Sequence, residues 1–254
     1  MKSQKLDKIK DQPCYNWLLA VTAPMLLWSW GTDWSQIWMA TEFRDGSFEE
    51  NRKPITESWG IQNHDDLVET INRLLSLDMH GYGGRGFFDQ IALTGKHKQQ
   101  EIIDNLESDQ LRDEFRFHQM AYDLVGNCRF FGFDLMRATY LSRHGFVSGW
   151  LSEDEMLFFL SYAARKIQYL FPDWATYHRS YILGRVFWRY SVNDEGPEIL
   201  FTDGSFTCYS QFYSCLNLPN APVWDSLPFD LQLPIFDAPE SLFLKAQEEQ
   251  KEEA

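Results

Sequence analysis

Cysteine is scarce in this chain, with four residues among 254 and no C-x-x-C pair. A disulfide framework and a structural zinc site both need cysteines at close, regular spacing. The scattered thiols of Cys14, Cys128, Cys208 and Cys215 therefore predict a protein of a reducing compartment, the cytoplasm, without disulfides. We expect no bound metal, and no motif points to any other cofactor.

Basic residues are also few. Lys and Arg total 23 against 37 Asp and Glu, which gives a formal net charge of -14 at pH 7. Binding to duplex DNA or to an anionic membrane surface depends on clustered Lys and Arg that release counterions. The charge balance therefore argues against nucleic acid and favours a basic protein partner or a small ligand.

No apolar run is long enough for a membrane-spanning helix. Residues 17–28 are strongly apolar, but a span needs about 20 such residues and Pro24 interrupts this run. A secretory signal would end at a small-residue cleavage site, which is missing here. We therefore expect a core helix and no membrane insertion. The nearby tryptophans are expected to pack in the core: Trp28, Trp30, Trp34 and Trp38.

Familiar catalytic motifs are missing as well. The six histidines are scattered without an H-E-x-x-H pattern, and there is neither a G-x-S-x-G elbow nor a recognised cysteine nucleophile motif. His144 and His178 are expected to be packed or exposed rather than catalytic. The sequence predicts no catalytic residue, although an active site assembled only by folding would leave no such motif.

What the sequence does have is core material, because 44% of its residues are hydrophobic and 16% are aromatic. The stretch 133–190 contains three successive helix signals, and the rest of the chain is expected to be organised around it. The first helix covers residues 133–141, and we expect Gly145 and Gly149 to interrupt it.

The second helix begins with a capping box. The Ser152 side chain is placed to accept from the backbone amide of Glu155, whose carboxylate reaches back to the amide of Ser152. Apolar residues at helical spacing follow, and Pro172 ends the helix. Asp173 is then expected to cap a third helix with an aromatic stripe that includes one charge. The stripe consists of Trp174, Tyr177, Tyr181, Arg185 and Trp188.

Shorter signals precede this stretch. Charge and Gly46 predict a loop over residues 41–58. Asn63 and Asp66 are expected to cap a helix that ends near Asp78.

A glycine cluster follows at residues 80–86, and backbone amides in such a cluster are able to cradle a phosphate. This cluster follows a helix rather than a strand and matches neither the dinucleotide nor the P-loop pattern. We therefore favour a flexible connector. Two helices are expected after it, at residues 99–106 and 111–125.

Turn signals recur at short intervals after residue 190. We interpret residues 191–238 as an irregular wrapping segment with room for one small hairpin, and residues 239–254 as an acidic tail helix. The expected fold class is mainly α. The chain is predicted to be one multi-helix domain over residues 1–254, with its helical core at 59–190.

Four motifs occur within residues 59–190 in a distinctive order and spacing. They are Trp59-Gly60-Ile61, Phe133-Asp134-x-x-Arg137, Gly149-x-Leu151-Ser152-x-x-Glu155, and Trp174 followed by Ser180-Tyr181-Ile182-Leu183-Gly184-Arg185-x-Phe187-Trp188. Together they resemble the YbeU/YbeR-like bacterial family (DUF1266), a domain of unknown function. The resemblance implies a bacterial, cytoplasmic protein. It implies no reaction, so no catalytic residue carries over.

Polar residues of the central stretch form a candidate polar or ligand-binding centre. Asp134 and Arg137 are three apart and are expected to meet on the surface of one helical turn. In the structural hypothesis, Arg185 pairs with Asp134 or a glutamate and holds the helices together, while Glu155 is used in capping. The candidates are Asp134, Arg137, Glu153, Glu155, Tyr181, Arg185 and Trp188.

The leading functional hypothesis is a non-enzymatic protein-interaction module of the inhibitor, immunity or adaptor type, whose acidic surface recognises a basic partner. The alternative is an enzyme or small-molecule sensor with an anion-binding pocket around Arg185, flanked by Tyr181 and Trp188. The two hypotheses differ in where the functional polar side chains lie. The first places them on the surface, and the second places them in one cleft.

Overall fold

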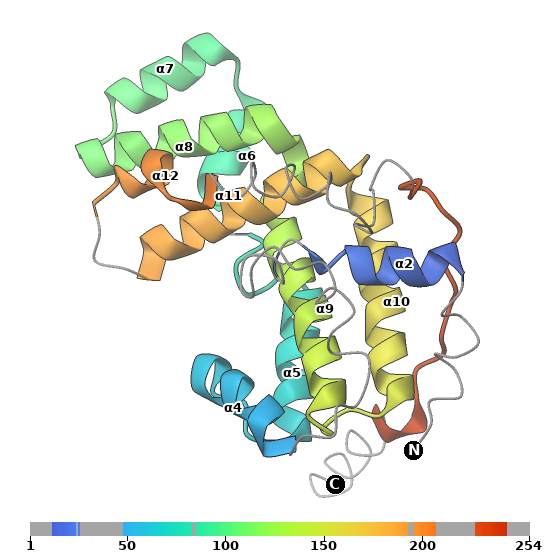
Figure 1. Cartoon of the computed structure of the whole chain (residues 1–254). Coiled ribbons are helices and arrows are strands. Elements are labelled where there is room, and N and C mark those ends of the chain that lie inside the picture. Colours follow the sequence, from blue (N-terminus) through green and yellow to red (C-terminus); the bar gives the residue numbers. More distant parts are fainter. Residues whose placement is uncertain are drawn as a thin grey trace, which may run out of the picture. The chain divides into compact units, whose positions relative to one another are not determined.

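The computed structural model describes residues 12–23, 25, 48–82, 85–192, 196–206 and 227–242. Within these residues every regular element is a helix and no strand is present (Figure 1), which confirms the mainly α fold class. The predicted hairpin has no counterpart in the described parts of residues 191–238, and residues 207–226 lie outside them. The α-helices are α2 (Pro13–Ala20), α4 (Phe48–Trp59), α5 (His64–Leu75), α6 (Arg85–Leu93), α7 (Lys96–Asp104), α8 (Asp109–Val125), α9 (Phe131–Val147), α10 (Glu153–Leu170), α11 (Trp174–Val192) and α12 (Ile199–Thr202). Two short 3-10 helices, η2 (Gly126–Cys128) and η4 (Glu240–Leu242), accompany them.

The chain divides into two compact units, each built from segments that are separate in the sequence. Unit 1 consists of Met1–Asn72, Arg137–Lys166 and Pro222–Ala254. Unit 2 consists of Arg73–Met136 and Ile167–Ala221. Each unit is described below by itself. The single-domain organisation expected from the sequence stays a prediction.

The three helices predicted within residues 133–190 are confirmed as α9, α10 and α11. The expected interruption at Gly145 is wrong, because this glycine lies inside α9. A Cβ atom at Gly145 would lie 2.4 Å from Leu67 Cδ2 and 2.9 Å from Leu151 Cδ1, so glycine is needed for close packing. Gly149 follows the end of α9 with a φ of +68°, a conformation that favours glycine.

Three predicted helix caps are also confirmed. The Glu155 amide donates to Ser152 Oγ at 3.2 Å, and the Ser152 amide donates to Glu155 Oε2 at 2.7 Å. Asp173 Oδ1 accepts from the Thr176 amide at 2.7 Å. Asn63 Oδ1 accepts from two first-turn amides of α5, at 2.9 and 3.0 Å. Local sequence therefore determines where these helices begin.

In unit 1, α2 is a core helix over the part that the structure describes. Trp17 is fully buried, its Nε1 donates to the Pro228 carbonyl at 3.2 Å, and its ring lies 5.8 Å from that of Phe229. The predicted packing of the later tryptophans falls on residues 26–47, outside the described residues. No helix in the described ranges is both long and apolar enough to cross a membrane.

Helix α4 corrects the prediction of a loop over residues 41–58, of which residues 41–47 lie outside the described ranges. The helix includes Pro54 and exposes most of its side chains, so its own sequence favours it weakly. Contacts with the end of α9 hold it. Asn51 Nδ2 donates to the Val147 carbonyl at 3.1 Å, and Arg52 Nε donates to the Ser148 carbonyl at 2.9 Å. These carbonyls lie at the C-terminal end of α9, where helix carbonyls lack partners within the helix.

In unit 2, the predicted helices at 99–106 and 111–125 correspond to α7 and α8, whereas α6 was not expected. His118 on α8 is fully buried among phenylalanine rings, including those of Phe88 and Phe187 at centroid distances of 5.0 Å. Helices α9 and α11 approach each other through glycines. A Cβ at Gly132 would lie 2.7 Å from the Tyr177 carbonyl oxygen.

Candidate functional site

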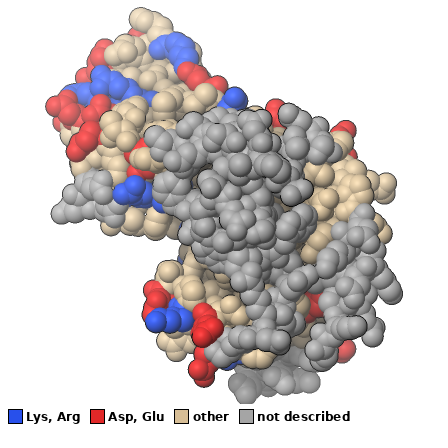
Figure 2. Space-filling model, in the orientation of Figure 1, with Lys and Arg blue, Asp and Glu red and all other residues tan. Residues whose placement is uncertain are grey.

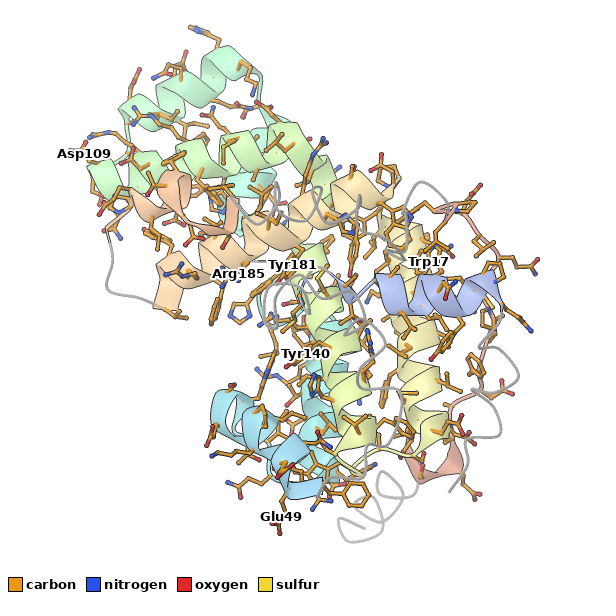
Figure 3. The ribbon with its side chains drawn as sticks, in the orientation of Figure 1. Trp17, Glu49, Asp109, Tyr140, Tyr181 and Arg185 are labelled. Atoms are coloured by element: carbon orange, nitrogen blue, oxygen red, sulfur yellow. The ribbon has the colours of Figure 1, made fainter. Side chains whose placement is uncertain are left out.

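The candidate residues named from the sequence do not all belong to one compact unit. Arg137, Glu153 and Glu155 lie in unit 1, and the other four lie in unit 2. Tyr181 and Arg185 both project from α11 (Figure 3). The structure therefore describes these residues as separate polar clusters, one compact unit at a time.

Asp134 is completely buried on α9. Its Oδ2 accepts from the backbone amides of His80 and Gly81, at 2.9 and 2.6 Å. The expectation that Asp134 and Arg137 lie on the surface is wrong, because Arg137 is buried as well. The glycine cluster at 80–86 thus presents backbone amides to an anion, and this anion is a carboxylate of the chain itself.

Arg185 faces Asp203, whereas the structural hypothesis expected Asp134 or a glutamate as its partner. Arg185 Nη1 lies 3.9 Å from Asp203 Oδ1 and also donates to the Ser205 hydroxyl. Arg189 Nη1 lies 2.6 Å from Asp203 Oδ2. The Ser205 amide donates to Asp203 Oδ1 at 2.6 Å. Two guanidinium groups of α11 therefore share one buried carboxylate that follows α12.

The remaining candidates make aromatic contacts. The rings of Tyr181 and Trp188 each lie 6.0 Å from that of Phe133, so both help to pack α11 against the unit 2 part of α9. In unit 1, the Arg137 guanidinium lies over the Trp59 ring at 5.6 Å. A guanidinium in this position is stabilised by the negative face of the ring.

Glu155 is part of a compact cluster in unit 1. Besides closing the capping box, its Oε1 lies 2.9 Å from His64 Nε2 and accepts from the Ser241 hydroxyl at 2.8 Å. The other ring nitrogen of His64, Nδ1, lies 3.0 Å from Asp65 Oδ1. A protonated His64 donates to both carboxylates at once. The cluster therefore joins the first turns of α5 and α10 to η4.

The two ionisable partners stabilise each other's charge. Burial by itself would lower the pKa of His64, but hydrogen bonds to Asp65 and Glu155 outweigh burial and raise it above 6.5. Burial by itself would raise the pKa of Glu155, but the Ser152 amide, His64 and Ser241 outweigh burial and lower it below 4.5. Between these two pKa values, His64 and Glu155 are both predominantly charged.

Stability should therefore depend on pH through His64. Because the folded pKa of His64 is raised, its contribution is fully present below pH 6.5 and is lost as the pH rises through the folded pKa. The His64 side chain is 35% exposed, so solvent screens the pair and the effect is modest. We expect the melting temperature to fall from pH 6 to pH 9 more steeply in the wild type than in His64→Gln. Equal slopes in thermal unfolding across this range would contradict a structural role for the charged histidine.

Three helices of unit 1 begin close together around the C-terminal end of α9. His64 contacts Glu155, and the Phe48 ring lies 2.9 Å from where a Cβ of Gly149 would stand. Carboxylates in the first turn of a helix are favoured by its dipole. We call the first-turn acidic residues of these helices the acidic pole: Glu49 and Glu50 of α4, Asp65 and Asp66 of α5, and Glu153, Asp154 and Glu155 of α10.

The acidic pole lies at the lower end of unit 1, where Glu49 is labelled (Figure 3). Figure 2 shows acidic side chains over α4 at the lower left, with basic side chains among them. The cation of Arg52 is turned toward the protein, because it donates to the Ser148 carbonyl and lies over the rings of Phe48 and Trp150, at 5.7 and 5.4 Å. A pole of this kind attracts a positively charged surface.

Further polar groups of α9 are used inside unit 1. Thr139 Oγ1 accepts from Thr22 Oγ1 at 2.9 Å, and Arg143 Nη1 donates to the Leu19 carbonyl at 3.5 Å. Burial lowers the pKa of Arg143 to about 10, so the guanidinium stays charged at neutral pH. Leu19 lies in the last turn of α2, where the helix dipole favours a cation. Arg143 thus stabilises the packing of α2 against α9.

His144 and His178 are both buried, which is one of the two placements expected for them. Burial lowers the pKa of His144 to about 3, with the neighbouring Arg143 charge acting in the same direction. Burial also lowers the pKa of His178 to about 3. Both imidazoles are therefore neutral at physiological pH and are packed in the core rather than presented to a substrate.

In the part of the chain that the structure describes, no three His, Cys, Asp or Glu side chains are gathered closely enough to hold a metal ion. Sequence reasoning missed several residues of the polar clusters: His64, Arg189, Asp203, Ser205 and Ser241. The sequence signal that would have identified His64 is its position between the capping residue Asn63 and two aspartates. Asp203 and Ser241 lie in irregular stretches, where periodicity gives no information about side-chain direction.

The fold and the sites define a class: over the described residues, a helical protein in which the buried carboxylates of Asp134 and Asp203 are engaged by the chain itself and three helix starts form an acidic pole. The chain belongs to the family described as "Protein of unknown function (DUF1266)", which matches residues 55–229. This finding confirms the resemblance seen in the sequence motifs and extends it beyond residue 190.

Two relatives from Escherichia coli (strain K12) are similar to this chain. "Uncharacterized protein YbeR" is 27% identical over 145 residues, which cover 56% of this chain and 60% of the relative. "Uncharacterized protein YbeU" is 29% identical over 148 residues, which cover 57% of this chain and 61% of the relative. The chain thus spans about 60% of the length of the curated relatives that it matches. No solved structure matches it.

Proposed function

We propose that this chain is a non-enzymatic protein-interaction module of the bacterial cytoplasm that binds a basic protein partner through the acidic pole. The observation that carries this proposal is the convergence of three helix starts, each with acidic first-turn residues, at one end of unit 1. The net charge of -14 gives a long-range attraction for the same kind of partner. The free thiols of Cys14 and Cys128 agree with a reducing compartment.

The buried histidines support binding rather than acid–base chemistry. His118, His144 and His178 all lie in the core, so none of them is placed to exchange protons with a bound substrate. The alternative function, an anion-binding pocket around Arg185, would require the ligand to compete with Asp203, which already lies beside Arg185 and Arg189. The acidic pole therefore offers the better-supported function.

The test compares two variants with the same net charge. One removes three charges from the acidic pole: Glu49→Gln, Glu50→Gln and Glu153→Gln. The matched control removes three exposed charges from unit 2: Asp78→Asn, Asp104→Asn and Glu107→Gln. We expect the pole variant to bind its partner about tenfold more weakly, because exposed ion pairs contribute about 0.2–1 kcal/mol each. The control should bind nearly as well as the wild type.

Binding is measured by capture of proteins from the native cytosol on the tagged full chain, followed by association rates for each captured protein at low and high salt. A partner of the proposed kind is basic, and its association rate falls as salt rises. Equal loss of binding in both triple variants would mean that only overall charge matters. A captured partner that is acidic or insensitive to salt would contradict the proposal.

A further inference from the structure

Unit 2 contains a surface pocket whose described lining is apolar except for one cationic side chain. Its volume is about 210 Å³. The pocket lies among α8, α11 and the segment after α12, and it is distinct from the Asp203 cluster and from the acidic pole. It is lined by Leu124, Arg179, Ile182, Leu183 and Phe206.

The walls of the pocket come from helix faces that are set by spacing. Arg179, Ile182 and Leu183 lie at positions i, i+3 and i+4 of α11, so they share one face of that helix. Ile182 and Leu183 are buried and form the floor, whereas Leu124 in the last turn of α8 is 43% exposed and lies at the mouth. A ligand that covers an exposed leucine beside an apolar pocket removes apolar surface from water, which favours binding at this place.

Arg179 is the polar group of this pocket. Among the described residues it has no hydrogen-bond or ion-pair partner. The basic residues of α7 and α8 differ in this respect, because Lys96, Lys98, Arg112 and Arg116 each pair with a carboxylate. The exposed Arg179 guanidinium is therefore available beside an apolar pocket in an acidic protein.

The carboxylate nearest in sequence to Leu124 does not pair with Arg179. Asp123 precedes Leu124, but its two oxygens accept from Lys96 Nζ, each at 2.7 Å. An anionic group from outside the chain therefore has no acidic competitor among these residues for the guanidinium. Arginine binds both carboxylates and phosphates through two parallel hydrogen bonds, and a singly charged carboxylate suits a described lining with a single cation.

We propose that this pocket binds a small monocarboxylate with an apolar body, whose chain fills the space among Leu124, Ile182, Leu183 and Phe206 while its carboxylate pairs with Arg179. The size agrees with this class, because an engineered cavity of about 150 Å³ in another protein holds benzene. A space of 210 Å³ thus has room for a saturated chain of about eight carbons or a single ring. The ligand is anionic at one end only, since Arg179 is the one charged side chain in the described lining.

The test uses octanoate and 1-octanol, which share the same chain and differ in charge. Equilibrium dialysis and calorimetry with the full chain should show saturable binding of octanoate, and octanoate should bind at least about tenfold more tightly than octanol, a ratio worth about 1.4 kcal/mol. Arg179→Met should abolish this preference and leave octanol binding unchanged. Leu124→Gln should weaken the binding of both.

The matched control is Arg165→Met, which removes another exposed arginine that the described residues leave without a partner and that does not line the pocket. It should bind both compounds as the wild type does. Circular dichroism and thermal unfolding confirm that each variant is folded. The proposal is overturned if octanoate shows no saturable binding, if octanol binds as tightly as octanoate, or if Arg165→Met weakens octanoate as much as Arg179→Met does.

Discussion

Replacement of Asp134 by alanine should lower the free energy of unfolding by about 2–6 kcal/mol, because two backbone amide donors would lose their acceptor at about 1–3 kcal/mol per donor. The amide of Gly81 donates in a buried hydrogen bond and that of His80 in a partly buried one, and the Asp134 side chain is completely buried. Domains are stable by only about 5–15 kcal/mol. The expected loss is therefore a large part of the total. Urea denaturation measures it as a lower midpoint at an unchanged slope.

Asp134→Asn is the matched control. It keeps one side-chain oxygen in the position of Oδ2, which accepts both hydrogen bonds in the wild type. We expect this variant to recover about half or more of the stability that alanine loses, because it keeps an acceptor for both amides and removes their charge assistance and the 3.9 Å pairing of Oδ1 with His80 Nδ1. If alanine and asparagine destabilised the protein equally, the backbone amides would not be the reason for a buried carboxylate on α9.

Local signals in the sequence predicted that the central segments are helices and where these helices begin. Ser152 with Glu155, Asp173 and Asn63 each cap a helix through contacts that span only two or three residues. Such contacts depend on sequence spacing alone, so they are predictable without tertiary information. The family motifs gave the right family for the same reason, since they lie at fixed spacing along the chain.

Tertiary packing determined the features that the sequence did not predict. Helix α9 has a glycine in its interior at position 145 because Leu67 leaves no room there for a side chain. Leu67 is far from Gly145 in the sequence. Helix α4 is held by side-chain hydrogen bonds to carbonyls at the end of α9. Neither contact leaves a periodic signal in the segment concerned.

The candidate site shows the same division between local and long-range information. The aromatic stripe on α11 led us to expect Arg185 against the protein with Asp134 or a glutamate as its partner, and the carboxylate beside it is that of Asp203. The identity of that carboxylate was not predictable, because Asp203 lies after the short helix α12 in a stretch without helical periodicity. Glu155 was placed in its capping box from sequence, whereas its contacts with His64 and Ser241 depend on the fold.

Removal of both arginines that face Asp203 should destabilise the protein by about 3–5 kcal/mol, the usual effect of leaving a buried charge without its partner. Arg189→Ala alone should have the larger single effect, because its Nη1 lies 2.6 Å from Asp203 whereas that of Arg185 lies 3.9 Å away. In either single variant the other arginine still balances the carboxylate. The double variant should therefore lose more than the sum of the two single losses.

The decisive addition is Asp203→Asn in the double variant, which removes the stranded charge and should restore part of the lost stability. Thermal and urea unfolding of the four proteins and of this triple variant measure the coupling directly. If Arg185→Ala kept the stability of the wild type and the double variant lost no more than Arg189→Ala alone, Arg185 would have no structural role beside Asp203. The anion-binding alternative for Arg185 would then be favoured, because a binding residue is able to lose its side chain without cost to the fold.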